Sequence, residues 1–117
     1  MTRRTQRVAD ATKEVIAAVL LKDVKDPRIG MVTLTAVTVS ADLRHARVFF
    51  SVLGDAAKRE ESLAGLRSAS GFIRREVARQ LGLRVAPELV FEFDPSLEQA
   101  DRISQLLKSV IPGETGS

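Results

Sequence analysis

A single glycine interrupts a helical pattern in the middle of the chain, and it constrains the fold more than any other feature. Apolar residues recur at helical spacing on both sides of Gly71, which directly follows two small residues, Ala69 and Ser70. Glycine inside a helix costs roughly 1 kcal/mol relative to alanine, so a helix is expected to bend or end here. The pattern therefore predicts a kink between two helical segments, 56–69 and 72–81.

Basic residues surround this predicted kink. A helix that begins after it would point free N–H groups and the positive end of its dipole outward, where a phosphate could bind. The arginine guanidinium bonds two phosphate oxygens at once. The alternative is that these arginines only solvate a helix, with Glu76 neutralising part of their charge; for the group beside the glycine we favour phosphate binding. The candidate RNA-binding residues are Arg67, Ala69, Ser70, Gly71, Arg74, Arg75, Arg79 and Arg84, together with Arg3, Arg4 and Arg7 near the N-terminus.

Hydrophobic periodicity predicts a single α+β domain over residues 1–110, followed by a flexible tail over 111–117. The connection between the first two predicted strands is short, which favours an antiparallel hairpin. In order, the predicted elements are a helix over 5–24, strands over 31–40 and 44–53, the two helical segments, a strand over 84–94 and a C-terminal helix that ends near 110. We expect the helices to cover one face of a three-stranded sheet.

Two residues bear on the arrangement of the strands. The apolar alternation of the first strand slips after Ala36, so either a bulge lies there or the strand is central and buried on both faces. Pro87 cannot donate a hydrogen bond to a neighbouring strand, which places the third strand at an edge of the sheet.

The residue inventory argues against catalysis. The 117 residues include no cysteine and one histidine, His45, which excludes thiolate metal sites, thiol nucleophiles and a histidine cluster. No phosphate-loop or G-x-S-x-G segment occurs. We therefore predict that the chain is not an enzyme and has no metal, no cofactor and no small-molecule substrate. A hydrolase or isomerase that uses Glu88 and Glu92 is the enzymatic alternative, although an exposed strand offers no cleft.

Positive charge is concentrated in the first three quarters of the chain. Residues 1–86 hold 16 Lys and Arg against 9 Asp and Glu, and residues 87–117 hold 2 against 6. The resulting charges of +7 and −4 indicate a polyanionic partner on one side of the molecule. No apolar stretch reaches 18 residues, so we expect no membrane span and a cytoplasmic location.

The aromatic residues do not form a stacking platform for bases. All five are phenylalanines, and the strand and helix patterns place only Phe49 on an outer face. The others, Phe50, Phe72, Phe91 and Phe93, are predicted to face the core. Binding to RNA should therefore depend on backbone shape and charge.

Five segments in this order resemble ribosome-binding factor A, a family of bacterial small-subunit assembly factors, over most of the chain. They are Val24-Lys25-Asp26-Pro27-Arg28-Ile29-Gly30, Val39-Ser40-Ala41-Asp42-Leu43, Val52-Leu53-Gly54, Ala69-Ser70-Gly71-Phe72-Ile73-Arg74 and Leu83-Arg84-Val85-Ala86-Pro87-Glu88-Leu89. The resemblance implies a type II K-homology fold, with an Ala-x-Gly kink at Ala69-Ser70-Gly71 in place of the usual GXXG loop. It also implies that the first strand is central and that the third is parallel to it.

The same resemblance implies a function and a partner. Members of this family bind the 30S subunit near the decoding region of 16S ribosomal RNA during late maturation, take part in cold adaptation and are not enzymes. Ala69, Ser70, Gly71 and Arg74 carry over from the family pattern, while Arg75 and Arg79 rest on the charge argument alone. We expect a monomer. The alternative is a scaffold that binds another protein through the first helix or the sheet face around Phe49.

Overall fold

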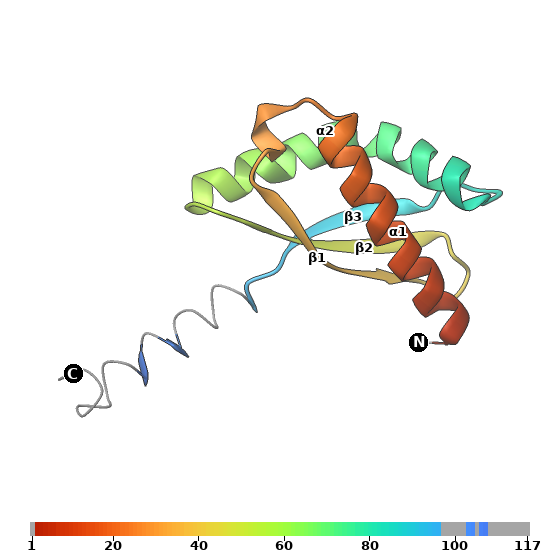
Figure 1. Ribbon diagram of the computed structural model, residues 1–117, viewed down its shortest axis with the longest axis horizontal. Coiled ribbons are helices and arrows are strands. Elements are labelled where there is room, and N and C mark those ends of the chain that lie inside the picture. The colour runs from red at the N-terminus through yellow and green to blue at the C-terminus, as the bar shows by residue number, and fades with distance from the viewer. Residues whose placement is uncertain (1, 97–102, 105, 108–117) are drawn as a thin grey trace.

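A computed structural model describes residues 2–96, 103, 104, 106 and 107 (Figure 1). The elements are α1 (Arg3–Lys22), the short 3-10 helix η1 (Pro27–Ile29), β1 (Val32–Val39), β2 (His45–Val52), α2 (Ala56–Leu81) and β3 (Glu88–Phe93). The α+β class is confirmed. The four described residues beyond 96 are helical. The rest of the predicted C-terminal helix and the predicted tail over 111–117 lie outside the described residues.

The three strands form one mixed sheet in the order β1-β2-β3. β2 pairs antiparallel with β1 and parallel with β3, so β2 is the central strand. The expectation of a central β1 with the third strand parallel to it is wrong, because β3 is parallel to β2 and runs opposite to β1. The long α2 crossover explains this order, because it returns the chain to the free side of β2 in the same direction. The register of β1 shifts between Leu34 and Ala36, which confirms the bulge, and β3 lies at an edge as Pro87 predicted.

Both long helices cover the same face of the sheet (Figure 1). Alternate β2 residues point toward them, and burial of such side chains contributes about 1.5–3 kcal/mol each. Phe50 in this layer meets the ring of Phe93 edge to face, with centroids 6.1 Å apart. The buried apolar residues that join the layers include Ile16 and Val19 of α1, Ala46, Val48 and Phe50 of β2, Leu66, Ile73 and Val77 of α2, and Phe91 of β3.

The helix α2 runs without a break through Gly71, so the prediction of two helices is wrong. Its axis bends along its length in Figure 1, but no second helix begins after the glycine. Burial of Leu66 on one side and of Ile73 and Val77 on the other outweighs a cost of roughly 1 kcal/mol for one glycine. The continuous helix also turns Phe72 away from the core, where the sequence had placed it, and leaves that side chain 37% exposed.

The close helix contact in α2 occurs at Gly65, not at Gly71. A Cβ at position 65 would lie 2.8 Å from Cγ2 of Ile29 in η1. One turn earlier, the Ser62 hydroxyl donates a hydrogen bond of 2.8 Å to the carbonyl of Arg28. These two small buried residues let η1 lie directly on α2.

Local capping follows the sequence closely. The Asp55 carboxylate accepts a hydrogen bond from the N–H of Lys58 and so caps the start of α2. Gly82 ends the helix in the left-handed conformation, with φ of 64°, which glycine adopts without steric cost. The ends of α2 are thus determined by adjacent residues.

Candidate nucleic-acid interface

Three predicted residues lie on one exposed face of α2. Arg67, Gly71 and Arg75 are exposed and four residues apart, which stacks them along the helix. A Cβ built at Gly71 would meet no atom closer than Nη1 of Arg75, at 3.6 Å. We call these three residues the arginine stripe. Gly71, in the middle of the stripe, has no side chain, although the fold has room for one there.

Arg74 has a role inside the molecule. Its Nε donates to the carbonyl of Pro87 at 3.0 Å, and one terminal nitrogen donates to the carbonyl of Ala86 at 3.2 Å. These hydrogen bonds connect α2 to the segment that leads into β3. The guanidinium that the family resemblance pointed to therefore already has two backbone partners.

Arg79 is paired with an acidic neighbour one turn before it. Its terminal nitrogen lies 2.6 Å from Oε2 of Glu76, and its Nε donates to the same oxygen at 3.0 Å. Hydrogen bonds from Arg79, and then from Gln80, hold the pKa of the Glu76 carboxyl below its usual range. At Arg79, therefore, the structure agrees with the alternative that the arginine only solvates the helix while Glu76 neutralises its charge.

The small residues before Gly71 are only partly accessible. Ala69 and Ser70 are half-buried, and Ala69 packs against the core. These two residues therefore contribute less to the exposed face of α2 than Gly71 does.

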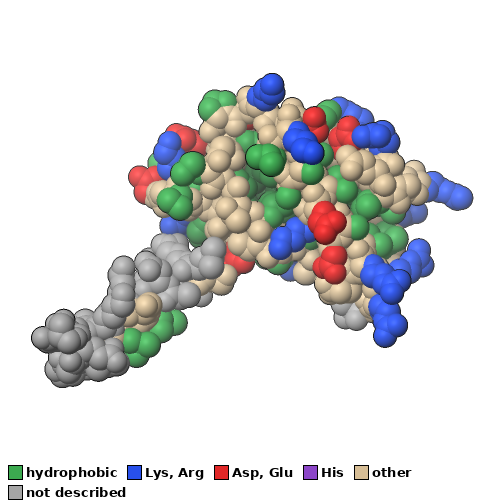
Figure 2. Space-filling view, in the orientation of Figure 1, with side chains coloured by type: hydrophobic (Ala, Val, Ile, Leu, Met, Phe, Trp, Pro, Cys, Tyr) green, Lys and Arg blue, Asp and Glu red, His purple; other side chains and the backbone are tan. Residues whose placement is uncertain are grey.

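Arg4 and Arg84, distant in sequence, line one pocket of about 320 Å³. The structure adds Arg44, which the sequence reasoning did not select. The signal for it was its place directly after the Asp42-Leu43 turn. The complete lining is Arg4, Asp42, Leu43, Arg44, Gly82, Leu83, Arg84 and Val85. Arg3 and Arg7 are also exposed on α1 but do not line this pocket. Figure 2 shows Lys and Arg side chains gathered at this end of the molecule, where α1 begins.

The outer face of the sheet holds its charges in pairs. The Arg47 guanidinium bonds the Glu92 carboxylate at 2.7 Å and lies over the ring of Phe49, 5.2 Å from its centroid. Nε2 of His45 lies 3.4 Å from the Glu88 carboxylate. Both carboxylates of the enzymatic alternative therefore face basic partners on an open strand surface.

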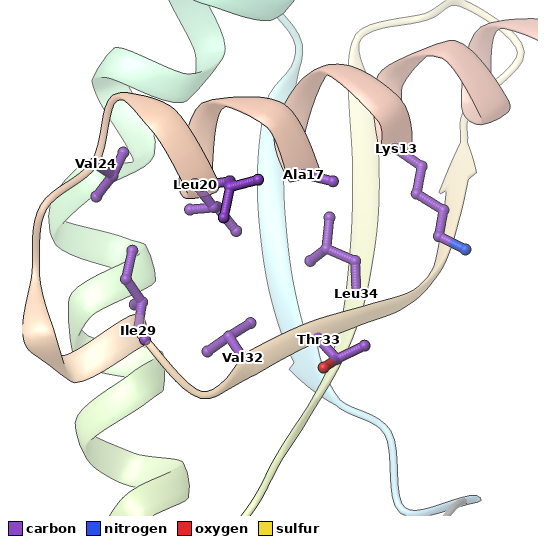
Figure 3. Close-up of a pocket in the computed structure, with 10 residues that line it drawn as sticks. Lys13, Ala17, Leu20, Val24, Ile29, Val32, Thr33 and Leu34 are labelled. Atoms are coloured by element: carbon purple, nitrogen blue, oxygen red, sulfur yellow. The ribbon is translucent and has the colours of Figure 1, made fainter.

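An apolar hollow of about 500 Å³ lies between α1 and β1 (Figure 3). Leu20, Val24 and Leu34 line it, and Lys13 stands at one end, where its amine donates to the carbonyl of Thr35 at 3.4 Å. The hollow offers no set of convergent polar groups for catalysis among its described residues. In that part of the chain, no three His, Cys, Asp or Glu side chains are grouped as metal ligands would be.

Comparison with known proteins places this arrangement in a family. The family model for ribosome-binding factor A matches residues 4–107. A ribosome-binding factor A from Geobacter metallireducens is 47% identical and covers 100% of this chain and 99% of its own length. One from Geobacter sulfurreducens is 46% identical, with 94% and 93% covered.

Solved structures agree with the fold. The solution structure of a Thermotoga maritima protein described as a ribosome binding factor A has a TM-score of 0.70 and 34% identity, and the match covers 77% of this chain and 86% of that one. The Thermus thermophilus crystal structure has a TM-score of 0.66 at 24% identity, covering 75% and 93%. The family model matches most of the chain, and two relatives of that name are 46–47% identical over nearly its full length: the chain belongs to the ribosome-binding factor A family.

Proposed function

We propose that this protein is a non-catalytic maturation factor that binds 16S ribosomal RNA in precursors of the 30S subunit. The arginine stripe carries the proposal, because the fold does not require a glycine at position 71. An added Cβ there would meet only ordinary van der Waals contact. A residue that costs roughly 1 kcal/mol in a helix, and that no internal contact needs, leaves space for an external partner.

The stripe suits an RNA backbone. Arg67 and Arg75 stand eight residues apart, or about 12 Å along a helix, with the bare turn of Gly71 between them. A strand that lies across the bare turn comes close to the helix, while a guanidinium on each side reaches its phosphates. We therefore propose the stripe as the phosphate-binding feature, instead of the helix N-terminus that the sequence had suggested.

The family name supports the partner. Both Geobacter relatives are named ribosome-binding factors. A Thermus thermophilus homology model of this factor was fitted into a cryo-EM map of a 30S complex; at 24% identity and a TM-score of 0.58 it supports the fold of this chain. A binding factor agrees with the predicted lack of catalysis. A role in late maturation and cold adaptation, a monomeric state and a cytoplasmic location remain our proposals.

The scaffold alternative has less support. Arg47 partly covers Phe49, the aromatic residue expected to anchor a protein partner on the sheet. No helix in the described part of the chain is long and apolar enough to cross a membrane. The position of Arg47 over Phe49 thus weakens the scaffold alternative on the sheet face.

Gly71→Leu tests the proposal. The variant fills the bare turn, so we expect at least tenfold weaker co-sedimentation with immature 30S particles, since a displaced strand loses contacts with both arginines. Its thermal unfolding should stay close to that of the wild type, because the position is open. Ala57→Leu places the same leucine side chain at an exposed position on the first turn of α2 and should bind normally. Equal binding by both variants would remove the stripe from the interface.

A further inference from the structure

We propose that the pocket lined by Arg4, Arg44 and Arg84 is a separate site for a phosphate group of an RNA strand. This inference rests on the RNA-binding function above and adds a second contact beyond the arginine stripe. The three arginines come from three places: the first turn of α1, the residue before β2 and the loop after α2. Only the folded chain brings their positive charges to one hollow.

The charge of this pocket is not balanced from within. Among the described residues that line it, Asp42 carries the one carboxylate, against three guanidinium groups. That carboxylate is already engaged, because it accepts hydrogen bonds from the Ser40 hydroxyl at 2.6 Å and from the Arg44 N–H at 3.0 Å. A dianionic or monoanionic phosphate would offset the remaining positive charge.

The turn beside Arg44 is strained. Leu43 has a φ of 61°, in the left-handed region that disfavours residues with a Cβ. Its N–H donates to the Ser40 carbonyl at 2.9 Å, and its side chain packs against the core while lining the pocket. A glycine would avoid the strain but would remove the apolar side chain that packs against the core and lines the pocket. The turn thus brings Arg44 into the lining of the pocket beside Leu43.

The pocket lies at the C-terminal end of the helix that carries the stripe. Gly82, which lines the pocket, closes the same helix that carries Arg67 and Arg75. About 10 Å of helix separates residue 75 from residue 82. An RNA strand that follows α2 across Gly71 toward its C-terminal end would reach this pocket, and the phosphate there belongs to its backbone.

Titration of the full-length, isotope-labelled protein tests the site without ribosomal particles. One arm uses inorganic phosphate and the other the trinucleotide ApApA, which has internal phosphodiesters and no terminal phosphate. We expect both to shift the backbone amide signals of Leu43, Arg44 and Arg84 in a saturable way. Arg44→Gln should weaken both affinities about tenfold, as loss of a charge-assisted contact does. Arg47→Gln, three residues later on the outer sheet face, should leave them unchanged.

The outcomes separate this site from the stripe. No saturable shift with either probe, or equal weakening in Arg44→Gln and Arg47→Gln, overturns the site. A response to inorganic phosphate without one to ApApA identifies a free-anion site and overturns the RNA assignment. Because 30S particles are absent, these results do not depend on binding through Gly71, which the Gly71→Leu comparison measures separately.

Discussion

Two glycines in one helix have opposite environments. Gly65 is buried against Ile29, where an added Cβ would come within 2.8 Å of another side chain. Gly71 is exposed, and an added Cβ would keep 3.6 Å from its nearest neighbour. The same residue type therefore serves internal packing at one position, and at the other, we propose, contact with RNA.

Alanine substitutions should change stability in opposite directions. Gly71→Ala is expected to raise the free energy of unfolding by up to about 1 kcal/mol, because alanine is the better helix former. Gly65→Ala should lower it by about 1–3 kcal/mol, because η1 would have to move away from α2. Urea unfolding followed by circular dichroism measures both. A loss of stability in Gly71→Ala would mean that the fold itself needs this glycine.

At the scale of elements, the end of β3 is joined to the bulge of β1. The Thr35 hydroxyl donates to Oδ2 of Asp94 at 2.7 Å, and the N–H of Ser96 donates to Oδ1 at 2.9 Å. The Thr35 hydroxyl, followed by the Ser96 N–H, holds the pKa of Asp94 below its usual range. Thr35, in the bulge of β1, thus supplies a hydrogen bond to Asp94, which directly follows β3.

This contact should depend on pH. Because the folded-state pKa of Asp94 is lowered, its contribution to stability is present above the unfolded pKa of about 3.9 and is lost as pH falls through the folded value. Asp94→Asn, which keeps an acceptor oxygen, should reduce the loss of stability below about pH 4. Unfolding measured from pH 2 to 6 provides the test, with Glu60→Gln, at an exposed position on α2, as the control. An unchanged acid profile in Asp94→Asn would contradict this role.

At the scale of the whole molecule, charge is divided along the chain. The net +7 of residues 1–86 lies in the part that holds the stripe and the pocket, and the −4 of residues 87–117 lies beyond it. A polyanion that neutralises such a surface releases counterions. We therefore expect binding of the proposed RNA partner to weaken as salt concentration rises.

The salt dependence of 30S binding should report the number of phosphate contacts. For the wild type, the logarithm of the binding constant should fall linearly with the logarithm of salt concentration. The double variant Arg67→Gln, Arg75→Gln should bind more weakly, and its slope should be smaller by about 2. Arg79→Gln is the matched control, because Glu76 already pairs with that arginine. Equal slopes for the wild type and the double variant would rule out phosphate contacts at the stripe.

Sequence alone determined what depends on neighbours in the chain. The helix and strand types and the cap at Gly82 follow from local periodicity and from what single residues permit in the backbone. Local periodicity also located the irregularity near Ala36, although it left open whether this was a bulge or a central strand. The family could be identified for a similar reason, since short segments in a given order are a local signal. Local information sufficed because each of these features involves residues only a few positions apart.

Tertiary structure decided what depends on residues far apart. It made β2 central through the α2 crossover, kept α2 whole across Gly71 because Leu66 and Ile73 are buried on either side, and assigned the arginines different roles. Arg74 bonds Ala86 and Pro87, while Arg44 joins Arg4 and Arg84. In each case packing, hydrogen bonds or charge from distant segments outweighs a local preference, such as the cost of about 1 kcal/mol for a glycine in a helix. A short stretch of sequence shows the local preference but not the distant contacts.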